Sequence, residues 1–309
     1  MHADITAPLP STRRMRDGST WEARIAIVTV LVFGLALSGV LLFALVGTAS
    51  PEGLIITTAT TAPHTPQNLI YPTGVTNPTQ PSGLSPPLPG ALSGYHRTYA
   101  TDFSGSSLPP GWVTFTGVPG GDPSAHFASS HVLVRDGMLE LVTYRDPRYG
   151  DQWTSGGLCQ CGHPMTYGAF FVRSRISNAG PNEVELLWPA NNQWPPEIDF
   201  NESGSRWSST SATVHHGTAR HDLFTQQNLA DIDLRRWHTW GVVWTPTSIT
   251  YTVDGVQWGK TLTTPDTIPQ LAMNLDLQQR PGCPTSFEVA CPPQGQTMYV
   301  DWVAEYSKT

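Results

Sequence analysis

Apolar and polar residues alternate in short runs from about residue 95 to residue 309. The clearest runs are residues 240–244, 249–253 and 256–258, joined by a Thr-Pro-Thr-Ser turn and by the pair Asp254-Gly255. Alternation with a period of two is typical of half-buried strands, and Asp-Gly favours the type I′ turn of a tight hairpin. The pattern therefore predicts two consecutive hairpins.

The same alternation predicts further strands at residues 138–144, 169–176, 183–188, 197–201, 210–215, 272–277 and 298–306. No stretch among them has the apolar period of an amphipathic helix. Many short strands joined by turns are typical of an antiparallel sandwich. We therefore expect an all-β domain of jelly-roll type over residues 95–309.

A different pattern occupies the N-terminal part of the chain. Residues 25–46 carry no charged side chain, and a helix of that length spans roughly 33 Å, the thickness of a bilayer core. Four arginines precede this apolar run, namely Arg13, Arg14, Arg16 and Arg24. By the positive-inside rule, residues 1–24 stay in the cytoplasm, residues 25–47 form a transmembrane helix or signal anchor, and the rest lies outside.

The apolar run is compatible with two cellular locations of the protein, the cell membrane and the outside of the cell. Gly47 and Ala49 are small residues that suit signal-peptidase cleavage, after which the protein would be secreted. The run is longer than the usual apolar region of a signal peptide, about 7 to 15 residues, which favours a retained anchor. We expect a single-pass protein of the cell membrane, with secretion after cleavage as the alternative.

Residues 48–94 are rich in Pro, Thr and Ser and lack an apolar period. Such composition predicts a disordered linker. It would serve either as a stalk that carries the following domain towards a distant polymer or as a spacer without a further role.

The amino-acid composition limits the classes of molecule that the protein is expected to bind. The formal net charge is -7 and only 13% of residues are charged, which offers a phosphate backbone no long-range attraction. Nucleic acid is therefore excluded as an expected partner. The chain has 11 Trp residues. Because indole faces stack on sugar rings, we expect a polysaccharide partner. We also expect a monomeric protein.

Three acids, Glu197, Asp199 and Glu202, stand within six residues of each other. In a strand the first two share one face while Ile198 points to the other. Glu202 joins them only if a β-bulge absorbs one residue before it, and we predict that bulge. The two Glu carboxyls would then lie near 5 Å apart, which suits a retaining glycosidase. A solvated strand face or a calcium site is the structural alternative.

Crowded carboxylates raise one another's pKa, so one of them holds a proton. We assign Glu197 as the ionised nucleophile, Glu202 as the protonated acid that later acts as base, and Asp199 as the residue between them that tunes both. This division of roles is the one that retaining glycoside hydrolysis needs.

The motif Glu197-Ile-Asp199-Phe-Asn-Glu202 resembles the bulged E-x-D-x-x-E signature of glycoside hydrolase family 16, the laminarinase, lichenase and agarase group. The surrounding segments are similar to the family in order and spacing. They are Tyr167-Gly168 with Arg173 and Arg175, Leu187-Trp188-Pro189, Trp194-Pro195, and the closing run from Val300-Asp301-Trp302 to Tyr306.

This resemblance covers about residues 95–309. It implies a curved, concanavalin-like jelly roll and retaining, endo-type cleavage of a β-linked glucan or galactan, with the three acids in the roles given above. No cofactor is required. A structural calcium ion on the convex face, near Asp301, is a further implication. Where the family carries a glycine-rich segment, this chain has Asp276-Leu-Gln278-Gln-Arg280, which leaves the substrate open.

Four residues are candidates for substrate binding. Trp194 and Trp188 flank the motif and could serve as sugar platforms, although Trp188 could equally be core. His215 occupies the place where the resemblance puts a histidine towards the scissile sugar, with a structural histidine as the alternative. Arg173 would reach the cleft if its strand lies beside the motif strand.

The four cysteines lie in the part expected outside the cytoplasm, where disulfides persist. Cys283 and Cys291 close a short loop easily, whereas Cys159 and Cys161 are too near in sequence to pair without strain, so cross-pairing is an alternative. A zinc site at Cys159, Cys161 and His163 is a minority interpretation, and we expect no metal there.

The sequence thus predicts a glycosidase that hydrolyses O-glycosyl bonds, with β-1,3- or β-1,3/1,4-glucan as the expected substrate. Transglycosylation is a variant of the same chemistry. The alternative is a lectin-like, non-catalytic carbohydrate-binding module, because lectins share the sandwich. A lectin has no need for three crowded acids, so the intact trio favours the enzyme. A cell-surface interaction protein on a stalk would explain the anchor but not the motif.

Overall fold

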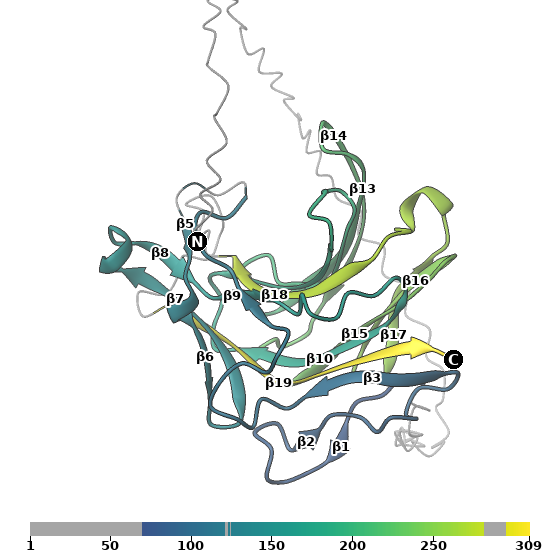
Figure 1. Cartoon of the computed structure of the whole chain (residues 1–309), viewed down its shortest axis with the longest axis horizontal. Coiled ribbons are helices and arrows are strands. Elements are labelled where there is room, and N and C mark those ends of the chain that lie inside the picture. The colour runs from purple at the N-terminus through teal and green to yellow at the C-terminus, as the bar shows by residue number, and fades with distance from the viewer. Residues whose placement is uncertain (1–69, 121–122, 124, 281–294) are drawn as a thin grey trace, which may run out of the picture. The chain divides into compact units, whose positions relative to one another are not determined.

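A computed structural model describes residues 70–120, 123, 125–280 and 295–309, and these form a sandwich of two curved sheets (Figure 1). One sheet has seven strands in the order β14 (His221–Ala230), β13 (Ser209–Thr218), β12 (Glu197–Glu202), β11 (Asn182–Pro189), β18 (Met273–Arg280), β9 (Gly157–Cys159) and β4 (Val113–Thr114).

The second sheet has ten strands. Its main path runs β17 (Val256–Leu262), β16 (Ser248–Val253), β15 (His238–Thr245), β10 (Gly168–Ile176), β19 (Gln296–Lys308), β7 (Met138–Asp146), β8 (Gln152–Ser155) and β5 (Ala125–Phe127). Two strands lie off this path: β3 (Tyr95–Thr101) pairs with β19, and β6 (Val132–Arg135) pairs with β7.

Smaller elements complete the described part. β1 (Val75–Thr76) and β2 (Leu84–Ser85) form a short ribbon, and three single-turn 3-10 helices occupy Ser129–His131, Pro147–Tyr149 and Pro265–Thr267. Within the described residues, every strand pairing is antiparallel except that of β5 with β8. The predicted antiparallel sandwich is therefore confirmed.

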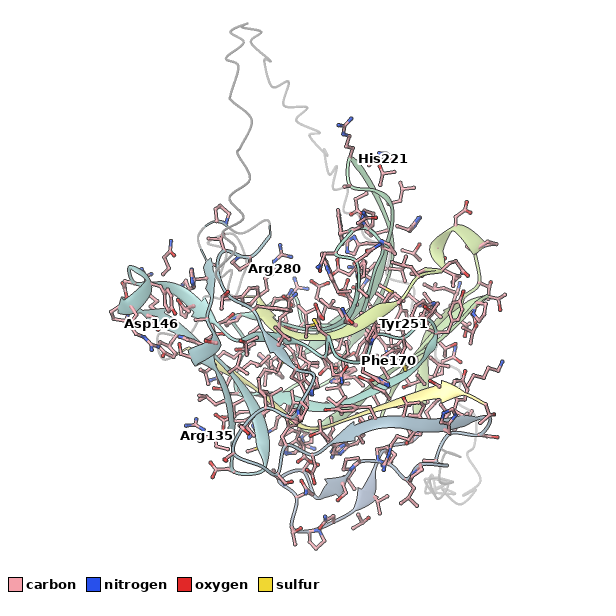
Figure 2. The ribbon with its side chains drawn as sticks, in the orientation of Figure 1. Arg135, Asp146, Phe170, His221, Tyr251 and Arg280 are labelled. Atoms are coloured by element: carbon pink, nitrogen blue, oxygen red, sulfur yellow. A yellow bond between two sulfur atoms is a disulfide. The ribbon has the colours of Figure 1, made fainter. Side chains whose placement is uncertain are left out.

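The main core fills the space between the two sheets. Alternating residues of each strand point inward, as half-buried strands require. Phe170 of β10 and Tyr251 of β16 lie fully buried between the layers (Figure 2). From the seven-stranded sheet, Ile198 and Phe200 of β12 enter the same core. The motif strand is thus anchored by apolar side chains on one face, which leaves its other face free for chemistry.

All the strands predicted from alternation are present, including the hairpins β15–β16 and β16–β17. The sequence analysis missed β14, which is an edge strand with mostly exposed side chains. An edge strand of this kind buries little apolar surface, so it lacks the alternation on which the prediction depends. The strands β1, β2, β4, β5, β6, β8 and β9 were not predicted because each has only two to four residues, and the seven-residue strand β3 was not predicted either.

Residues 70–94 differ from the predicted linker. They pack on the outer face of the ten-stranded sheet, where Leu92 and Tyr71 cover Phe171, Trp302 and Tyr306. The alternation along β10 and β19 places these aromatic side chains on the face away from the main core, where they need a cover. This Pro-rich stretch provides that cover without regular alternation of its own, so it belongs to the sandwich.

Residues 1–69 lie outside the described residues, and with them the predicted cytoplasmic segment, the predicted span at residues 25–47 and the start of the predicted linker. A search of the described residues finds no helix with the length and apolar character needed to cross a bilayer.

Candidate active site

All three acids of the motif lie on β12, and the strand carries the predicted irregularity. Asp199 lies opposite Thr213 of β13, whereas Glu202 lies opposite Ser211. Two residues of β12 therefore face a single residue of β13, which defines a β-bulge. The prediction of a bulge between Asp199 and Glu202 is confirmed.

The two residues of the bulge both point into the sandwich. Phe200 is fully buried in the main core, and Asn201 is fully buried beside it. The Thr210 hydroxyl donates to Asn201 Oδ1 at 2.6 Å and accepts from the Glu202 backbone N–H at 3.0 Å. Because two consecutive side chains turn inward, Glu202 turns outward and shares a face with Glu197 and Asp199.

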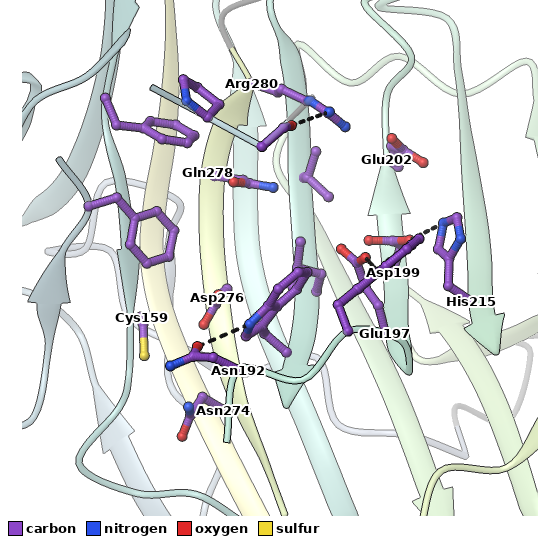
Figure 3. A pocket seen from close by; sticks show the side chains of 18 of the residues that line it. Cys159, Asn192, Glu197, Asp199, Glu202, His215, Asn274, Asp276, Gln278 and Arg280 are labelled. Atoms are coloured by element: carbon purple, nitrogen blue, oxygen red, sulfur yellow. Dashed lines mark hydrogen bonds and ion pairs between the residues drawn. The ribbon is translucent and has the colours of Figure 1, made fainter. Parts of the chain in front are cut away.

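That face forms a groove of about 650 Å³ on the outer side of the seven-stranded sheet. Its lining includes the three acids, and Figure 3 shows them side by side with His215 next to them. Across the groove lie the polar side chains of β18. The fold thus brings the predicted catalytic trio together in one concave site.

Glu197 is held by Trp194, whose indole N–H donates to Glu197 Oε2 at 2.6 Å. The pKa of Glu197 is raised above its ordinary value, chiefly by burial and further by the charge of Glu202. The hydrogen bond from Trp194 and the nearby His215 act in the opposite direction. A donor aimed at one carboxylate oxygen orients the other oxygen and favours the ionised form, which a nucleophile needs.

Asp199 is the most enclosed member of the trio, with 3% of its surface exposed. Burial, and then the charges of Glu197 and Glu202, raise the pKa of Asp199 well above its usual range. The raised pKa favours the protonated form of Asp199, beside the nucleophile candidate. The assignment of the proton to Glu202 stays a prediction.

His215 links the trio to the edge of the sheet. Its Nε2 lies 3.7 Å from Asp199 Oδ2, and its Nδ1 lies 2.9 Å from Asp222 Oδ2 on β14. The ring also lies beside Trp194, with ring centroids 5.7 Å apart. An imidazole held from one side by Asp222 presents its other nitrogen to the groove.

Glu202 has a partner that the sequence analysis did not consider. The Asn182 side-chain amide on β11 donates to Glu202 Oε1 at 2.8 Å. Along β13, the partners of Glu197 and Glu202 are His215 and Ser211, four residues apart. This separation corresponds to roughly 13 Å between the two Glu Cα atoms. The predicted carboxyl separation near 5 Å stays a prediction.

Of the four substrate-binding candidates, Trp188, Trp194 and His215 line the groove. Arg173 does not. It lies on β10 in the other sheet, where Nε donates to Ser82 Oγ at 2.8 Å and Nη1 donates to Thr239 Oγ1 at 3.1 Å. The prediction for Arg173 is wrong because β10 pairs with β15 and β19, so its side chain faces away from β12.

The surroundings of Asp301 bear on the expected calcium ion. The Ser82 hydroxyl donates to Asp301 Oδ2, and the charge of Arg173 also acts on this carboxyl. The described residues contain no group of three or more His, Cys, Asp or Glu side chains suited to a metal. The Ser82 hydroxyl already contacts one oxygen of Asp301, and the structural calcium ion near this residue stays a prediction.

Cys159 and Cys161 form a disulfide with Cα atoms 5.1 Å apart. The cross-pairing of these two cysteines with the later loop, given above as an alternative, is therefore wrong. Bonded sulfurs are not thiolate ligands, which argues against zinc at this place. Cys283 and Cys291 lie outside the described residues.

Sequence reasoning also left out the polar residues of β18 that line the groove, Asn274, Asp276 and Gln278. Their spacing of two places them on one face of a strand, and this signal was present in the sequence. Asp222 had no comparable signal, because its strand was not predicted.

The family model for glycosyl hydrolases family 16 matches residues 122–304, more than half of the chain. The chain belongs to this family. Two curated proteins of Rhizobium meliloti (strain 1021), the endo-1,3-1,4-beta-glycanases ExsH and EglC, are each 29% identical to it over 163 residues. The match covers 51% of this chain and 34% of each relative, so the chain spans about a third of their length.

Solved structures share the fold of this family 16 member. The laminarinase from Rhodothermus marinus aligns with a TM-score of 0.62 at 20% identity, over 70% of this chain and 98% of its own. A family 16 protein of Bacteroides ovatus, solved with a G4G4G3G product, aligns with a TM-score of 0.56 at 20% identity, over 67% and 99%. At such identity the likeness shows the fold.

Proposed function

We propose that the chain is a retaining, endo-acting hydrolase of a β-linked glucan, with β-1,3- or β-1,3/1,4-glucan as substrate. The observation that carries the proposal is the bulge of β12, which turns three acids into one groove. Glu197 acts as the nucleophile on the anomeric carbon, and Glu202 protonates the leaving oxygen and then activates water. Asp199 donates to Glu197 and tunes its basicity.

The groove is lined by side chains of four neighbouring strands, β11, β12, β13 and β18, so a polymer that lies across the sheet would suit an endo mode of attack. The names of the relatives support the choice of substrate. The curated relatives are endo-1,3-1,4-beta-glycanases, and the fold neighbours include a laminarinase. Trp188 and Trp194 line the groove and supply apolar faces for sugar rings.

The decisive test compares the unaltered protein with Glu197→Gln on laminarin and lichenan. We expect reducing-sugar release to fall by about a thousandfold or more in the variant, because the amide cannot attack the anomeric carbon. Binding of the glucan should persist. Glu140→Gln, on β7 of the other sheet, is the matched control and should retain activity.

A lectin-like module is the competing function and an outcome of the same test. If the unaltered protein binds glucans but releases no sugar from any β-glucan or β-galactan, the lectin interpretation replaces the enzyme. The complete trio argues against it, because binding alone does not require acids that destabilise each other's charge.

We further propose that residues 25–47 tether the protein to the cell membrane as a single span, with the catalytic domain outside. The proposal depends on the uncharged run and the arginines before it. Membrane fractionation of cells that express the full chain tests it. Recovery of the protein only from the medium, shortened at its N-terminus, would support the secreted alternative.

A further inference from the structure

One polar strip faces the catalytic acids from the other side of the groove. Asn274, Asp276 and Gln278 alternate along β18 and all line the groove, as Figure 3 shows. None of them belongs to the catalytic trio. Where a groove binds a sugar polymer, such a strip decides which hydroxyl groups find a partner.

Asp276 occupies the middle of this strip, level with the trio. Leu186 of β11 pairs with Asp199 on one side and with Asp276 on the other. Adjacent strands lie about 4.8 Å apart, so the Cα atoms of Asp199 and Asp276 are separated by roughly 10 Å. Leu186 is buried between them. This leaves room for one pyranose ring over the Leu186 side chain, flanked by a carboxyl on each side.

The Asp276 carboxyl lacks a partner in the part of the chain that the structure describes. The residue is 6% exposed, and its Oδ1 atom has no hydrogen bond. Asn274 is also 6% exposed, and its Oδ1 atom likewise has no hydrogen bond among the described residues. Buried polar atoms without partners destabilise a fold, so two neighbouring ones in a groove indicate that a ligand completes them.

The chemistry of the carboxyl indicates the ligand class. Burial, and then the charge of Glu197, raise the pKa of Asp276 well above its usual range. The raised pKa favours the protonated carboxyl, which offers one donor and one acceptor and so complements an alcohol. A charged sugar, such as a uronate, would instead bring a further carboxylate into a groove lined by four acid side chains and one arginine, Arg280.

We propose that Asp276 is a substrate-binding residue whose carboxyl hydrogen-bonds the hydroxyl groups of a neutral sugar lying over Leu186, on the β18 side of the scissile bond. Asn274 completes the contact from the next position of the strip. Asp276 thereby selects an unsubstituted neutral sugar at this subsite. The inference rests on the proposed function, because it takes the trio as the point of cleavage.

The test compares Asp276→Ala and Asp276→Asn for laminarin and lichenan cleavage and for binding of a laminari-oligosaccharide. We expect Asp276→Ala to lower kcat/KM and affinity by about 5- to 50-fold, because two sugar hydrogen bonds are lost. Asp276→Asn keeps a donor and an acceptor and should stay within about threefold of the unaltered protein. The melting temperature should stay level or rise in both variants.

Asp301→Asn is the matched control. Asp301 is also buried with an unpartnered Oδ1 atom, but it lies on β19 in the other sheet. This variant should change stability only. The inference is overturned if Asp276→Ala keeps both kcat/KM and affinity within about twofold, or if its loss of activity only follows a lowered melting temperature.

The same measurements distinguish a failure of the hydrolase proposal from a failure of the proposal for Asp276. If the unaltered protein binds the oligosaccharide without cleaving any polymer, the hydrolase proposal fails, and the binding series alone decides the role of Asp276. If the unaltered protein neither binds nor cleaves a neutral glucan, both proposals are overturned.

Discussion

The indole of Trp194 controls the charge of its neighbour. Its N–H donates to Glu197 Oε2, and this hydrogen bond lowers the pKa of Glu197 against the effect of burial. In Trp194→Phe the ring remains but the donor is lost. We expect kcat/KM to fall by about tenfold, and the acidic limb of the pH profile to move to higher pH, because the nucleophile must be ionised to react.

A pH profile of kcat/KM on laminarin measures both effects. Trp188→Phe is the control, because the indole N–H of Trp188 donates to Asn192 and not to an acid of the trio. Its acidic limb should not move. An unchanged acidic limb in Trp194→Phe would show that Glu197 is not the ionised group on which the rate depends.

At the scale of the element, β11 carries acids on the face opposite to the groove. Glu183 and Glu185 are buried between the sheets, and the Ser174 hydroxyl donates to both. Burial raises the pKa of Glu183 to about 7, and burial together with the charge of Glu183 raises the pKa of Glu185 well above its usual range. Both carboxyls belong to the strand that pairs with β12, which bears the active-site acids.

This pair predicts a pH-dependent stability. At pH values between the ordinary glutamate pKa and the raised pKa values, the folded protein holds protons that the unfolded chain has released. The stability from these protons is therefore fully present below this pH range and is lost as the pH rises through it. Urea unfolding should therefore give a larger free energy at about pH 5 than at about pH 8. Glu185→Gln, neutral at every pH, should show a smaller decrease. An equal decrease in both proteins would contradict a protonated Glu185.

At the scale of the whole molecule, the sandwich needs the stretch before β3. Residues 70–94 cover aromatic side chains on the outer face of the ten-stranded sheet, and the Tyr306 hydroxyl donates to the Leu88 carbonyl at 2.9 Å. A chain that starts at residue 95 should lose about 3 kcal/mol or more of unfolding free energy and bind hydrophobic dyes.

Thermal unfolding of chains that start at residues 64 and 95 tests this expectation. The longer chain keeps all of residues 70–94 and serves as the control. Equal melting temperatures would mean that the stretch contributes no stability and behaves as the linker that its composition predicted.

The sequence by itself determined the sandwich, the acid trio and the need for a bulge. Period-two alternation reports which side of a strand is buried, and the spacing of Glu197, Asp199 and Glu202 conflicts with that period unless one residue is absorbed. These properties are local, because each depends on side-chain direction within one strand. Trp188 and Trp194 also follow from their nearness to the motif along the chain, whereas His215 was predicted from the resemblance to the family.

Only the tertiary structure decided which distant strands meet. It placed Arg173 in the other sheet, put Asp276 across the groove from the trio, and joined Asp222 to His215 through the unpredicted edge strand β14. It also turned residues 70–94 into a cover for the outer face. Strand order and the packing of irregular segments depend on contacts between residues far apart in the chain, and alternation within a single strand carries no information about them.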